Sequence, residues 1–146
     1  MASDYLLELD GIKGESRDRR HPSSIEVSSW SWGASNAGST GGGSGGGTGK
    51  VVFQDFHFTK RCDSTSPQLF LRCATGEHIK KAVLYVRKSG GGGVEYMKVT
   101  MEDLLVSSYR ASAEQPADGM DTIEMSFSQI TFEGTSPGGG GGGGGA

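Results

Sequence analysis

Hydrophobic side chains alternate with a period of two along most of the 146-residue chain, which is the pattern of β-strands. The clearest case is a hairpin in which residues 81–89 and 94–101 form two strands joined by the glycines at 90–93. Glycine accepts the positive φ angles that a tight return of the chain needs. Further strands are predicted for residues 5–9, 24–32, 51–59, 104–111 and 122–132.

Two of the predicted strands change their apolar face partway along. In residues 24–32, Ile25 and Val27 occupy one face, whereas Trp30 and Trp32 occupy the other. In residues 122–132 the same change separates Ile123, Met125 and Phe127 from Ile130 and Phe132. A β-bulge would produce this change, and so would a strand whose second half is covered by another subunit. Both interpretations favour a closed or strongly curved sheet, and the second gives four candidate interface residues: Trp30, Trp32, Ile130 and Phe132.

One segment, residues 66–75, has helical periodicity instead. Ser66 is a favoured N-cap, Pro67 suits the first helical position, and Gly76 stands where a C-terminal glycine cap belongs. The apolar side chains that recur at helical spacing are Leu69, Phe70, Cys73 and Ala74. Such a helix of about two and a half turns is too short to be stable alone, so we expect it to pack on the sheet.

Two glycine-rich runs, at residues 38–49 and 138–146, have no apolar side chains to offset the entropy of ordering them. The rest of the chain is long enough for one core. We therefore predict a single β-rich domain over residues 1–136, with a flexible loop at 38–49 and a disordered tail at 137–146.

Composition and charge exclude several classes of protein. The net charge is −3 and the 14 basic residues are scattered, which argues against a nucleic-acid partner. Cys62 and Cys73 are too few for a disulfide framework and lack the grouping of a zinc site, so reduced thiols are expected; their pairing after export stays open.

Neither a secretory leader nor a membrane span is indicated. The N-terminal residues lack the basic start and apolar run of a signal peptide, and no stretch of ~18 apolar residues occurs. We expect a chain that is made in the cytoplasm, has no membrane partner, and leaves the cell, if at all, without a cleaved signal.

The stretch GGGSGGGTGKVVF, residues 41–53, resembles a phosphate-binding loop at first sight. That loop requires Gly, four residues, Gly-Lys, and then Ser or Thr. Here Ser44 occupies the first glycine position and Val51 stands where the hydroxyl is needed. A strand pattern follows Lys50, whereas a phosphate loop opens a helix. The stretch is therefore interpreted as a connection, and no nucleotide or other cofactor is predicted.

No constellation typical of catalysis or metal binding stands out. Asp55 and His57 share a strand face, but a hydrolase would need a nucleophile beside them, so a surface or interface pair is the preferred interpretation. The three histidines are far apart, and the charged stretch 15–21 is predicted to be a solvated loop, with subunit contact as a weaker option. One alternative function stays open: a free-standing ligand- or carbohydrate-binding barrel that uses Trp30 and Trp32 as a platform.

Several phrases, in the same order along the chain, resemble the Hcp family, whose members (hemolysin-coregulated proteins) form the inner tube of the bacterial type VI secretion system. The phrases are LELDGIKGES at 7–16, SWSWG at 29–33, KVVFQDFHFTK at 50–60, SPQLFLRCATGEHIKKAVLYVRKSGGG at 66–92, and VEYMKVTMEDLLVSSY at 94–109. The resemblance covers nearly all of residues 4–133.

This resemblance implies a small β-barrel of two curved antiparallel sheets with one helix at its side, similar to phage tail-tube proteins. It implies six-membered rings that stack into a tube, inside a contractile sheath and behind a spike, with small effectors in the lumen. Such a function is mechanical and carrier-like rather than enzymatic. The chain departs from the family in its long glycine-rich loop at 38–49 and its polyglycine tail. Nothing after Phe132 is long enough for a toxin domain, so a plain tube subunit is expected.

Overall fold

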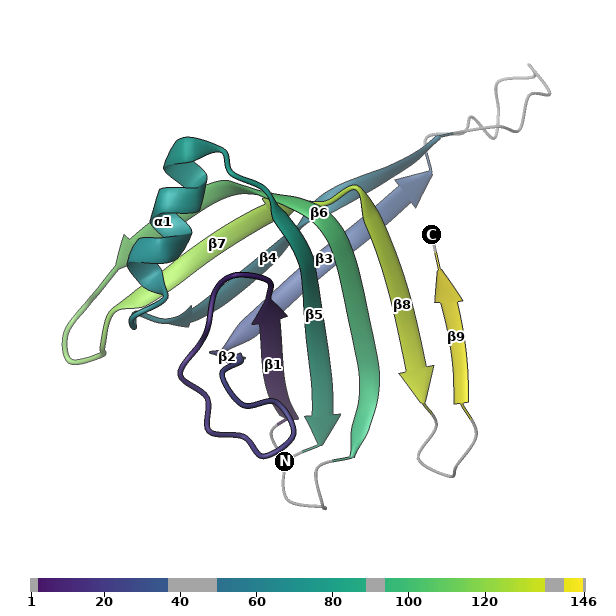
Figure 1. Ribbon diagram of the computed structural model, residues 1–146, viewed down its shortest axis with the longest axis horizontal. Helices are drawn as coiled ribbons and strands as arrows, with labels where there is room; N and C mark the ends of the chain where they lie inside the picture. The colour runs from purple at the N-terminus through teal and green to yellow at the C-terminus, as the bar shows by residue number, and fades with distance from the viewer. Residues whose placement is uncertain (1–2, 37–49, 89–93, 136–140, 146) are drawn as a thin grey trace.

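The computed structural model describes residues 3–36, 50–88, 94–135 and 141–145, so the predicted loop at 38–49 lies outside the described residues. Figure 1 shows two curved sheets with one helix at their side. The elements are, in chain order, β1 (Ser3–Leu9), β2 (Ile25–Val27), β3 (Ser29–Asn36), β4 (Val51–Arg61), α1 (Ser66–Thr75), β5 (Ile79–Lys88), β6 (Glu95–Ser112), β7 (Met120–Ser126), β8 (Gln129–Thr135) and β9 (Gly141–Gly145).

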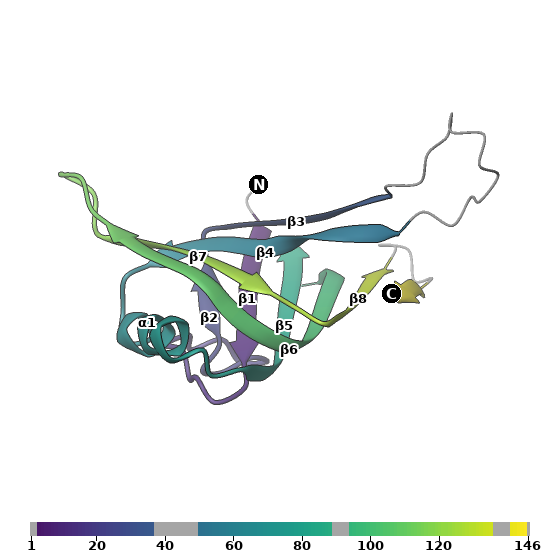
Figure 2. The same cartoon turned by 90° about the horizontal axis from the view of Figure 1, so that it is seen from above.

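Every strand pair is antiparallel, and the strands form two sheets that share β6. In the first, called sheet A here, the order is β2-β1-β5-β6-β8-β9; in the second, sheet B, it is β6-β7-β4-β3. The first half of β6 pairs with β5 and β8, and residues 105–112 pair with β7. Figure 2 shows the strands of the two sheets crossing at a steep angle, with β6 leading from one sheet to the other.

The hydrogen-bonded path starts at β2 and ends at β3, so the sheet is not closed by a strand ladder. The chain crosses the gap covalently at Ser28, whose N–H donates to the carbonyl of Thr59 at 2.8 Å. The mainly β fold, the two curved antiparallel sheets and, within the described residues, the one short helix are confirmed. The predicted barrel is open between β2 and β3, where only the chain at Ser28 crosses.

The two predicted changes of apolar face mark the places where the chain leaves one sheet for the other. β2 pairs with β1 and ends at Val27, and β3 begins at Ser29 and pairs with β4. β7 likewise ends in sheet B at Ser126, and β8 begins in sheet A at Gln129. The apolar face changes because the residues before each switch point toward the core from one sheet, and those after it point toward the core from the other sheet. Neither a bulge in a continuous strand nor a covering subunit is needed to explain it.

The predicted strands at 94–101 and 104–111 are a single strand, β6, which bends at Asp103 instead of ending there. Asp103 has a φ of 54°, and its side chain contacts the residues that immediately precede β5 and β8. The Asp103 Oδ1 and His78 Nδ1 atoms are 2.7 Å apart, and Ser128 Oγ donates to Asp103 Oδ2 at 3.0 Å. These side-chain contacts hold the corner at which β6 passes from sheet A into sheet B.

Helix α1 has the predicted bounds and the predicted C-terminal cap. Gly76 adopts a φ of 73° and its N–H donates to the Arg72 carbonyl at 2.9 Å. The predicted N-cap was wrong by one residue: Thr65 occupies that position without a side-chain cap, because its hydroxyl donates to Asp63. The Ser66 hydroxyl donates to Asp121. The helix buries Leu69 completely against the core.

Both sheets contribute to one apolar core, which is sealed on one side by α1. Its fully buried larger side chains are Leu7, Ile25, Phe56, Phe58, Leu69, Ile79, Leu84, Met101, Leu104, Ile123 and Met125. Within the described part of the chain, no helix is long and apolar enough to cross a membrane.

The tail, predicted to be disordered over 137–146, is a strand at 141–145. This strand, β9, pairs with β8 from Thr135↔Gly141 to Thr131↔Gly145. Glycines can pair through the main chain alone, and the outer edge of β8 offers N–H and C=O groups that need partners. Residues 137–140 and 146 lie outside the described part of the chain.

Candidate functional site

The first candidate surface is the far end of the β3–β4 hairpin, which projects beyond the body of the molecule (Figure 2). Val51, Val52 and Phe53 begin β4 there, and 53%, 52% and 39% of these side chains is exposed. The Phe53 ring packs edge-on against Phe127, with centroids 5.6 Å apart. A run of exposed apolar side chains on a projecting strand is typical of a surface that another chain covers.

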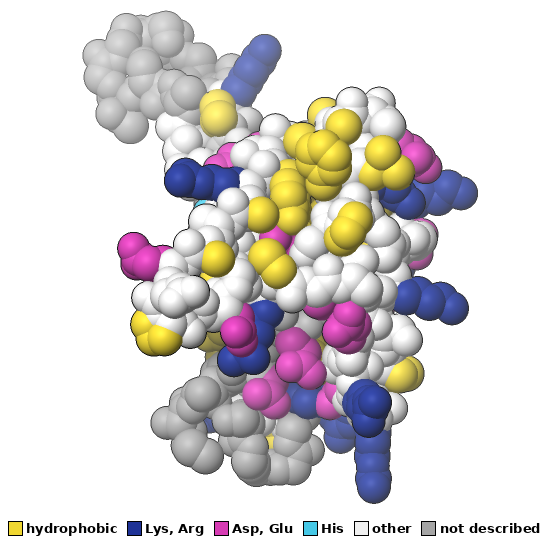
Figure 3. Space-filling view, turned by 90° about the vertical axis from the view of Figure 1, so that its left-hand side faces the viewer, with side chains coloured by type: hydrophobic (Ala, Val, Ile, Leu, Met, Phe, Trp, Pro, Cys, Tyr) yellow, Lys and Arg dark blue, Asp and Glu magenta, His cyan; other side chains and the backbone are white. Residues whose placement is uncertain are grey.

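The second candidate surface lies on α1, at the opposite side of the molecule from the hairpin tip (Figures 1 and 2). Phe70 and Leu71 are 56% and 58% exposed, and the Phe70 ring lies 6.1 Å from that of Tyr109. Figure 3 shows this side of the molecule, with hydrophobic side chains gathered over its upper half and charged groups around them. The inward side of α1 is used for the core, so Phe70 and Leu71 are available to a partner.

The four interface residues predicted from sequence have different environments. Trp30 and Trp32 are half-buried and pack edge-on against Tyr5 and Phe132, with centroids 6.1 and 5.3 Å apart. Phe132 is 41% exposed, whereas Ile130 is 3% exposed and belongs to the core of its own chain. Trp30, Trp32 and Phe132 therefore remain predicted interface residues, whereas Ile130 is buried in the core of its own chain and is not available to a neighbour.

A buried polar cluster lies between α1 and sheet B, and we call it the under-helix cluster; its members are Lys60, Cys62, Asp63, Ser66, Tyr109 and Asp121. Lys60 and Asp121 are 1% and 0% exposed, and their Nζ and Oδ2 atoms are 2.7 Å apart. Sequence reasoning missed this cluster, although the pattern held an indication of it. Lys60 follows Phe56 and Phe58 on the core face of β4, a position where a lysine needs a buried partner.

The pKa values in this cluster follow from burial and hydrogen bonding. Burial alone would raise the pKa of Asp121, but hydrogen bonds from Lys60, Ser66, Tyr109 and Cys62 outweigh burial and lower it. Burial and the hydrogen bond to Asp121 raise the pKa of Tyr109 to about 12, and the same carboxylate raises the pKa of the Cys62 thiol. A protonated thiol beside a carboxylate is a poor nucleophile, so the cluster is built for structure.

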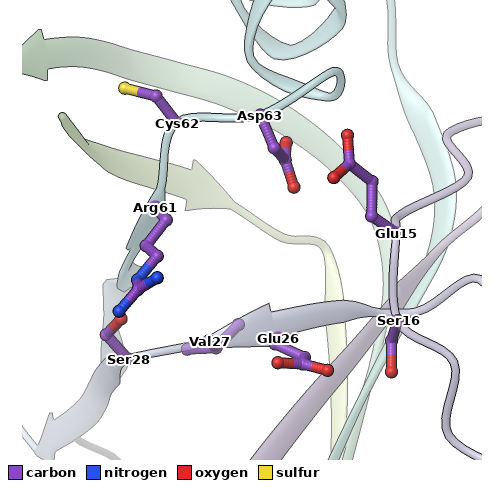
Figure 4. A pocket seen from close by; sticks show the side chains of 8 residues that line it. All are labelled: Glu15, Ser16, Glu26, Val27, Ser28, Arg61, Cys62 and Asp63. Carbon is purple, nitrogen blue, oxygen red and sulfur yellow. The ribbon is translucent and has the colours of Figure 1, made fainter. Parts of the chain in front are cut away.

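A surface pocket adjoins that cluster (Figure 4). Its volume is ≈ 400 Å³, and it is lined by Glu15, Ser16, Glu26, Val27, Ser28, Arg61, Cys62 and Asp63. Figure 4 shows Glu15 and Asp63 extending toward the space between them. Glu15 accepts the Ser64 N–H at 2.9 Å, which lowers the pKa of the Glu15 carboxyl, and Asp63 accepts from Lys60 and Thr65. These carboxylates hold the turn before α1, and no group of three potential metal ligands occurs among the described residues.

The segment 13–24, predicted in part to be a solvated loop, is tied to the outer face of sheet A by contacts among six ionisable side chains. We call these the loop cluster: Asp4, Glu8, Asp18, His21, Arg87 and Glu95. Arg87 pairs with Asp18 and, at 3.2 Å, with Asp4. The hydrogen bond from Arg87 lowers the pKa of Asp18 to about 2. Two members of the predicted loop, Asp18 and His21, thus contact ionisable groups on the strands. The other charged residues of that stretch are exposed, as predicted: Glu15, Arg17, Arg19 and Arg20.

Asp55 and His57 do not have the geometry of a hydrolytic site. The Ser107 hydroxyl donates to Asp55 Oδ2 at 2.7 Å, whereas a Ser–His–Asp triad requires the serine hydroxyl on the imidazole. The arrangement agrees with the preferred interpretation of a surface pair.

A family model described as "Type VI secretion system effector, Hcp" matches residues 6–133. The chain belongs to the Hcp family. It is 38% identical over 132 residues to the protein hcp1 of Pseudomonas aeruginosa, which covers 89% of this chain and 82% of that relative. Among solved structures it is similar to Hcp1 from Salmonella typhimurium, with a TM-score of 0.85, 37% identity, and 98% of this chain and 93% of that chain covered. A type VI secretion system effector from Yersinia pestis gives a TM-score of 0.83 at 25% identity, with 98% of each chain covered.

The resemblance drawn from the sequence phrases is thus confirmed over nearly the whole domain. Hcp proteins are secreted structural components of type VI secretion, and this chain is a tube or effector protein of that system. The alternative of a free-standing carbohydrate-binding barrel is not supported, because Trp30 and Trp32 pack against Tyr5 and Phe132 of their own chain.

Proposed function

We propose that this Hcp chain assembles into hexameric rings, and that the rings stack to form the inner tube of a type VI secretion system. The lumen of the rings carries small effectors. The sheath that surrounds the tube and the spike at its tip are the other partners. The chain is made in the cytoplasm and leaves the cell with the machine, without a cleaved signal peptide.

The observation that carries this proposal is the presence of two different apolar surfaces on one subunit. Val51, Val52 and Phe53 lie at the hairpin tip, and Phe70 and Leu71 lie on α1 at the opposite side. Two unlike surfaces favour head-to-tail contacts, in which each copy uses one surface toward each neighbour. Contacts of that kind close into rings when the rotation between neighbours divides a full turn, whereas one self-complementary surface would give a dimer.

The chain acts by assembly rather than by catalysis. The Lys60–Asp121 pair of the under-helix cluster is buried, the ionised groups of the cluster are paired with one another, and the carboxylates of the adjoining pocket are held by the turn before α1. These groups support the shape of the subunit. The pKa values of the Cys62 thiol and the Tyr109 hydroxyl are raised, so both groups keep their protons near neutral pH.

Native mass spectrometry at micromolar concentration tests the proposal directly. We expect a hexamer for the unmodified protein. Phe53→Ser and Leu71→Ser should each raise the concentration needed for assembly at least about tenfold, since losing ~1.4 kcal/mol of apolar contact has that effect. Phe132→Ser tests the remaining predicted interface residue in the same way.

Val94→Ser is the matched control, because Val94 is 48% exposed but belongs to neither surface. Its assembly should equal that of the unmodified protein. A strictly monomeric protein at tens of micromolar would overturn the ring proposal. Assembly unaffected by both Phe53→Ser and Leu71→Ser would show that the ring uses other surfaces.

A further inference from the structure

The segment that joins β1 to β2 lies across the outer face of sheet A, in front of β1 in Figure 1. It has a short ladder of its own: Gly14 N–H donates to the Ser23 carbonyl at 2.7 Å, Ser16 N–H to Ser24 at 3.0 Å, and Ser23 N–H to Ser16 at 2.9 Å. A side chain at Gly14 would lie 2.2 Å from the Ser24 carbonyl oxygen, so this close approach requires glycine. The segment is therefore a compact unit whose position depends on what fastens it to the strands.

Besides the contact of Glu15 with Ser64, two side chains of the segment, Asp18 and His21, fasten it to sheet A, and the His21 ring contacts three strands. Nδ1 lies 3.2 Å from Glu8 Oε2 on β1, and Nε2 lies 2.6 Å from Glu95 Oε2 on β6. The ring stacks on Tyr85 of β5, with centroids 3.8 Å apart and planes inclined by 23°. Only 11% of the histidine side chain is exposed, so water has little access to replace a lost partner.

The number of N–H donors on the His21 ring decides which protonation state of the ring this geometry requires. A neutral imidazole carries one N–H and one bare nitrogen, whereas an ionised carboxylate only accepts hydrogen bonds. With Glu8 and Glu95 on opposite ring nitrogens, a neutral ring could satisfy one of them and would point a lone pair at the other. With both carboxylates ionised, both contacts are hydrogen bonds only when both ring nitrogens carry a proton.

Other charged and titratable groups also lie near the His21 ring. Tyr85 is neutral there, because burial and the nearby carboxylate of Glu8 raise its pKa to about 12. On β5 and β6 the nearby cations are Arg87, which is occupied by Asp18 and Asp4, and Lys98, whose Nζ is 5.8 Å from the Tyr85 ring centroid. Within the segment itself, Asp18 accepts the His21 backbone N–H at 3.0 Å. The two carboxylates on the ring nitrogens are thus its direct ionic partners.

We propose that His21 is a protonation-dependent latch: as an imidazolium it bridges Glu8 and Glu95 and fastens residues 13–24 to sheet A, and loss of its proton opens one of the two bridges. The second fastening, Asp18 with Arg87, keeps its charge from about pH 5 upward, because the pKa of Asp18 is lowered and that of Arg87 is raised. Raising the pH therefore loosens the segment at His21 while Arg87 still holds it. The latch belongs to the single subunit and does not depend on ring formation.

The test uses the unmodified, isotope-labelled protein in solution. Long-range 1H–15N NMR spectra at pH 5.5 to 6 should show both His21 ring nitrogens protonated. Amide exchange at Gly14, Ser16 and Ser23, corrected for intrinsic rates, should then rise about tenfold over the pH range in which the same spectra show His21 losing a ring proton. A tenfold change corresponds to about 1.4 kcal/mol.

Two variants separate the latch from general loosening. His21→Gln should show fast exchange of the three amides at every pH, without the pH-dependent step, and His57→Gln should behave as the unmodified protein. Should His21→Gln fail to fold, Glu95→Gln serves instead, since it keeps the ring and removes one charge, and it should reduce the step. A neutral His21 at pH 5.5 to 6, or an equal step in His21→Gln and the unmodified protein, would overturn the proposal.

Discussion

The two polar clusters of this subunit hold similar groups in opposite environments. In the under-helix cluster, Lys60 and Asp121 are enclosed between α1 and sheet B, with 1% and 0% exposure. In the loop cluster, Asp4 and Glu8 are 42% and 40% exposed, while His21 and Asp18 are nearly covered. The Lys60–Asp121 pair at the centre of the first cluster is therefore shielded from solvent, whereas the second cluster lies at the boundary between protein and water.

This difference changes what each cluster contributes. Taking two charges out of water costs so much that a buried pair gives little net stability, yet removing one partner leaves the other unpaired at a large cost. Pairs at the surface are worth less, and salt and pH affect them. We expect the under-helix cluster to specify one packing of α1 on the sheet, and the loop cluster to respond to conditions.

The largest effect should come from Asp121→Ala. This change leaves Lys60 as an unpaired buried charge and removes the acceptor of Ser66 and Tyr109, so we expect a loss of about 3–5 kcal/mol in the free energy of unfolding, measured with urea at pH 7. The double variant Lys60→Met/Asp121→Leu removes both charges and should recover part of that loss. Equal losses in the single and double variants would show that the charge pairing is not the cause.

Asp18→Asn should have the next largest effect, roughly 1–2 kcal/mol at pH 7. The pKa of Asp18 falls from 3.8 to about 2 on folding, so the folded state binds fewer protons. The stabilisation is fully present above pH 4 and is lost as the pH falls toward 2. Urea unfolding of both proteins should thus show a gap at pH 7 that narrows in acid. If the difference in unfolding free energy between the two proteins did not change with pH, Asp18 would stabilise the protein through its local turn instead, where it accepts the Arg20 and His21 N–H groups.

Asp4→Asn removes the more exposed carboxylate from the same arginine. Since 42% of the Asp4 side chain is exposed and Asp18 remains on Arg87, we expect a loss of no more than about 1 kcal/mol. The loss should shrink further in 0.5 M salt, where exposed charges are screened. An effect of Asp4→Asn larger than that of Asp18→Asn would reverse the order of the two contacts.

The smallest effect is expected at Arg61 and Asp118. Their side chains are 79% and 80% exposed and their closest N and O atoms are 3.9 Å apart, so Asp118→Asn should leave the midpoint of urea unfolding unchanged within error. This variant is the exposed reference for the series. A measurable loss there would mean that the comparison between clusters is not governed by burial.

Much of the fold could be predicted from local patterns. The hairpin at 81–101 and the helix at 66–75 were identified because alternation, capping residues and glycine placement are properties of neighbouring residues. The chain passes from one sheet to the other at Ser28 and at residues 127–128, and the sequence shows these places only as a change of apolar face. Their cause could not be deduced, because it depends on which distant strand each half pairs with.

The polar clusters were harder to predict for a similar reason. Lys60 and Asp121 are 61 positions apart in the chain, and the sheet brings them together through the β4–β7 register, in which they are direct partners. Each alone looks like an ordinary charged residue, and only its place on a core-facing strand position indicates a buried role. The His21 contacts likewise join residues from three elements.

Strand β6 gives the subunit an unbroken main-chain connection through both sheets over its 18 residues. A push or pull applied to sheet A therefore reaches sheet B along covalent bonds, not only through side chains that can slide past one another. Asp103, which contacts His78 and Ser128, lies at the bend where such a load passes from one sheet to the other. In the tube proposed above, this would let each subunit bear an axial load as one stiff body.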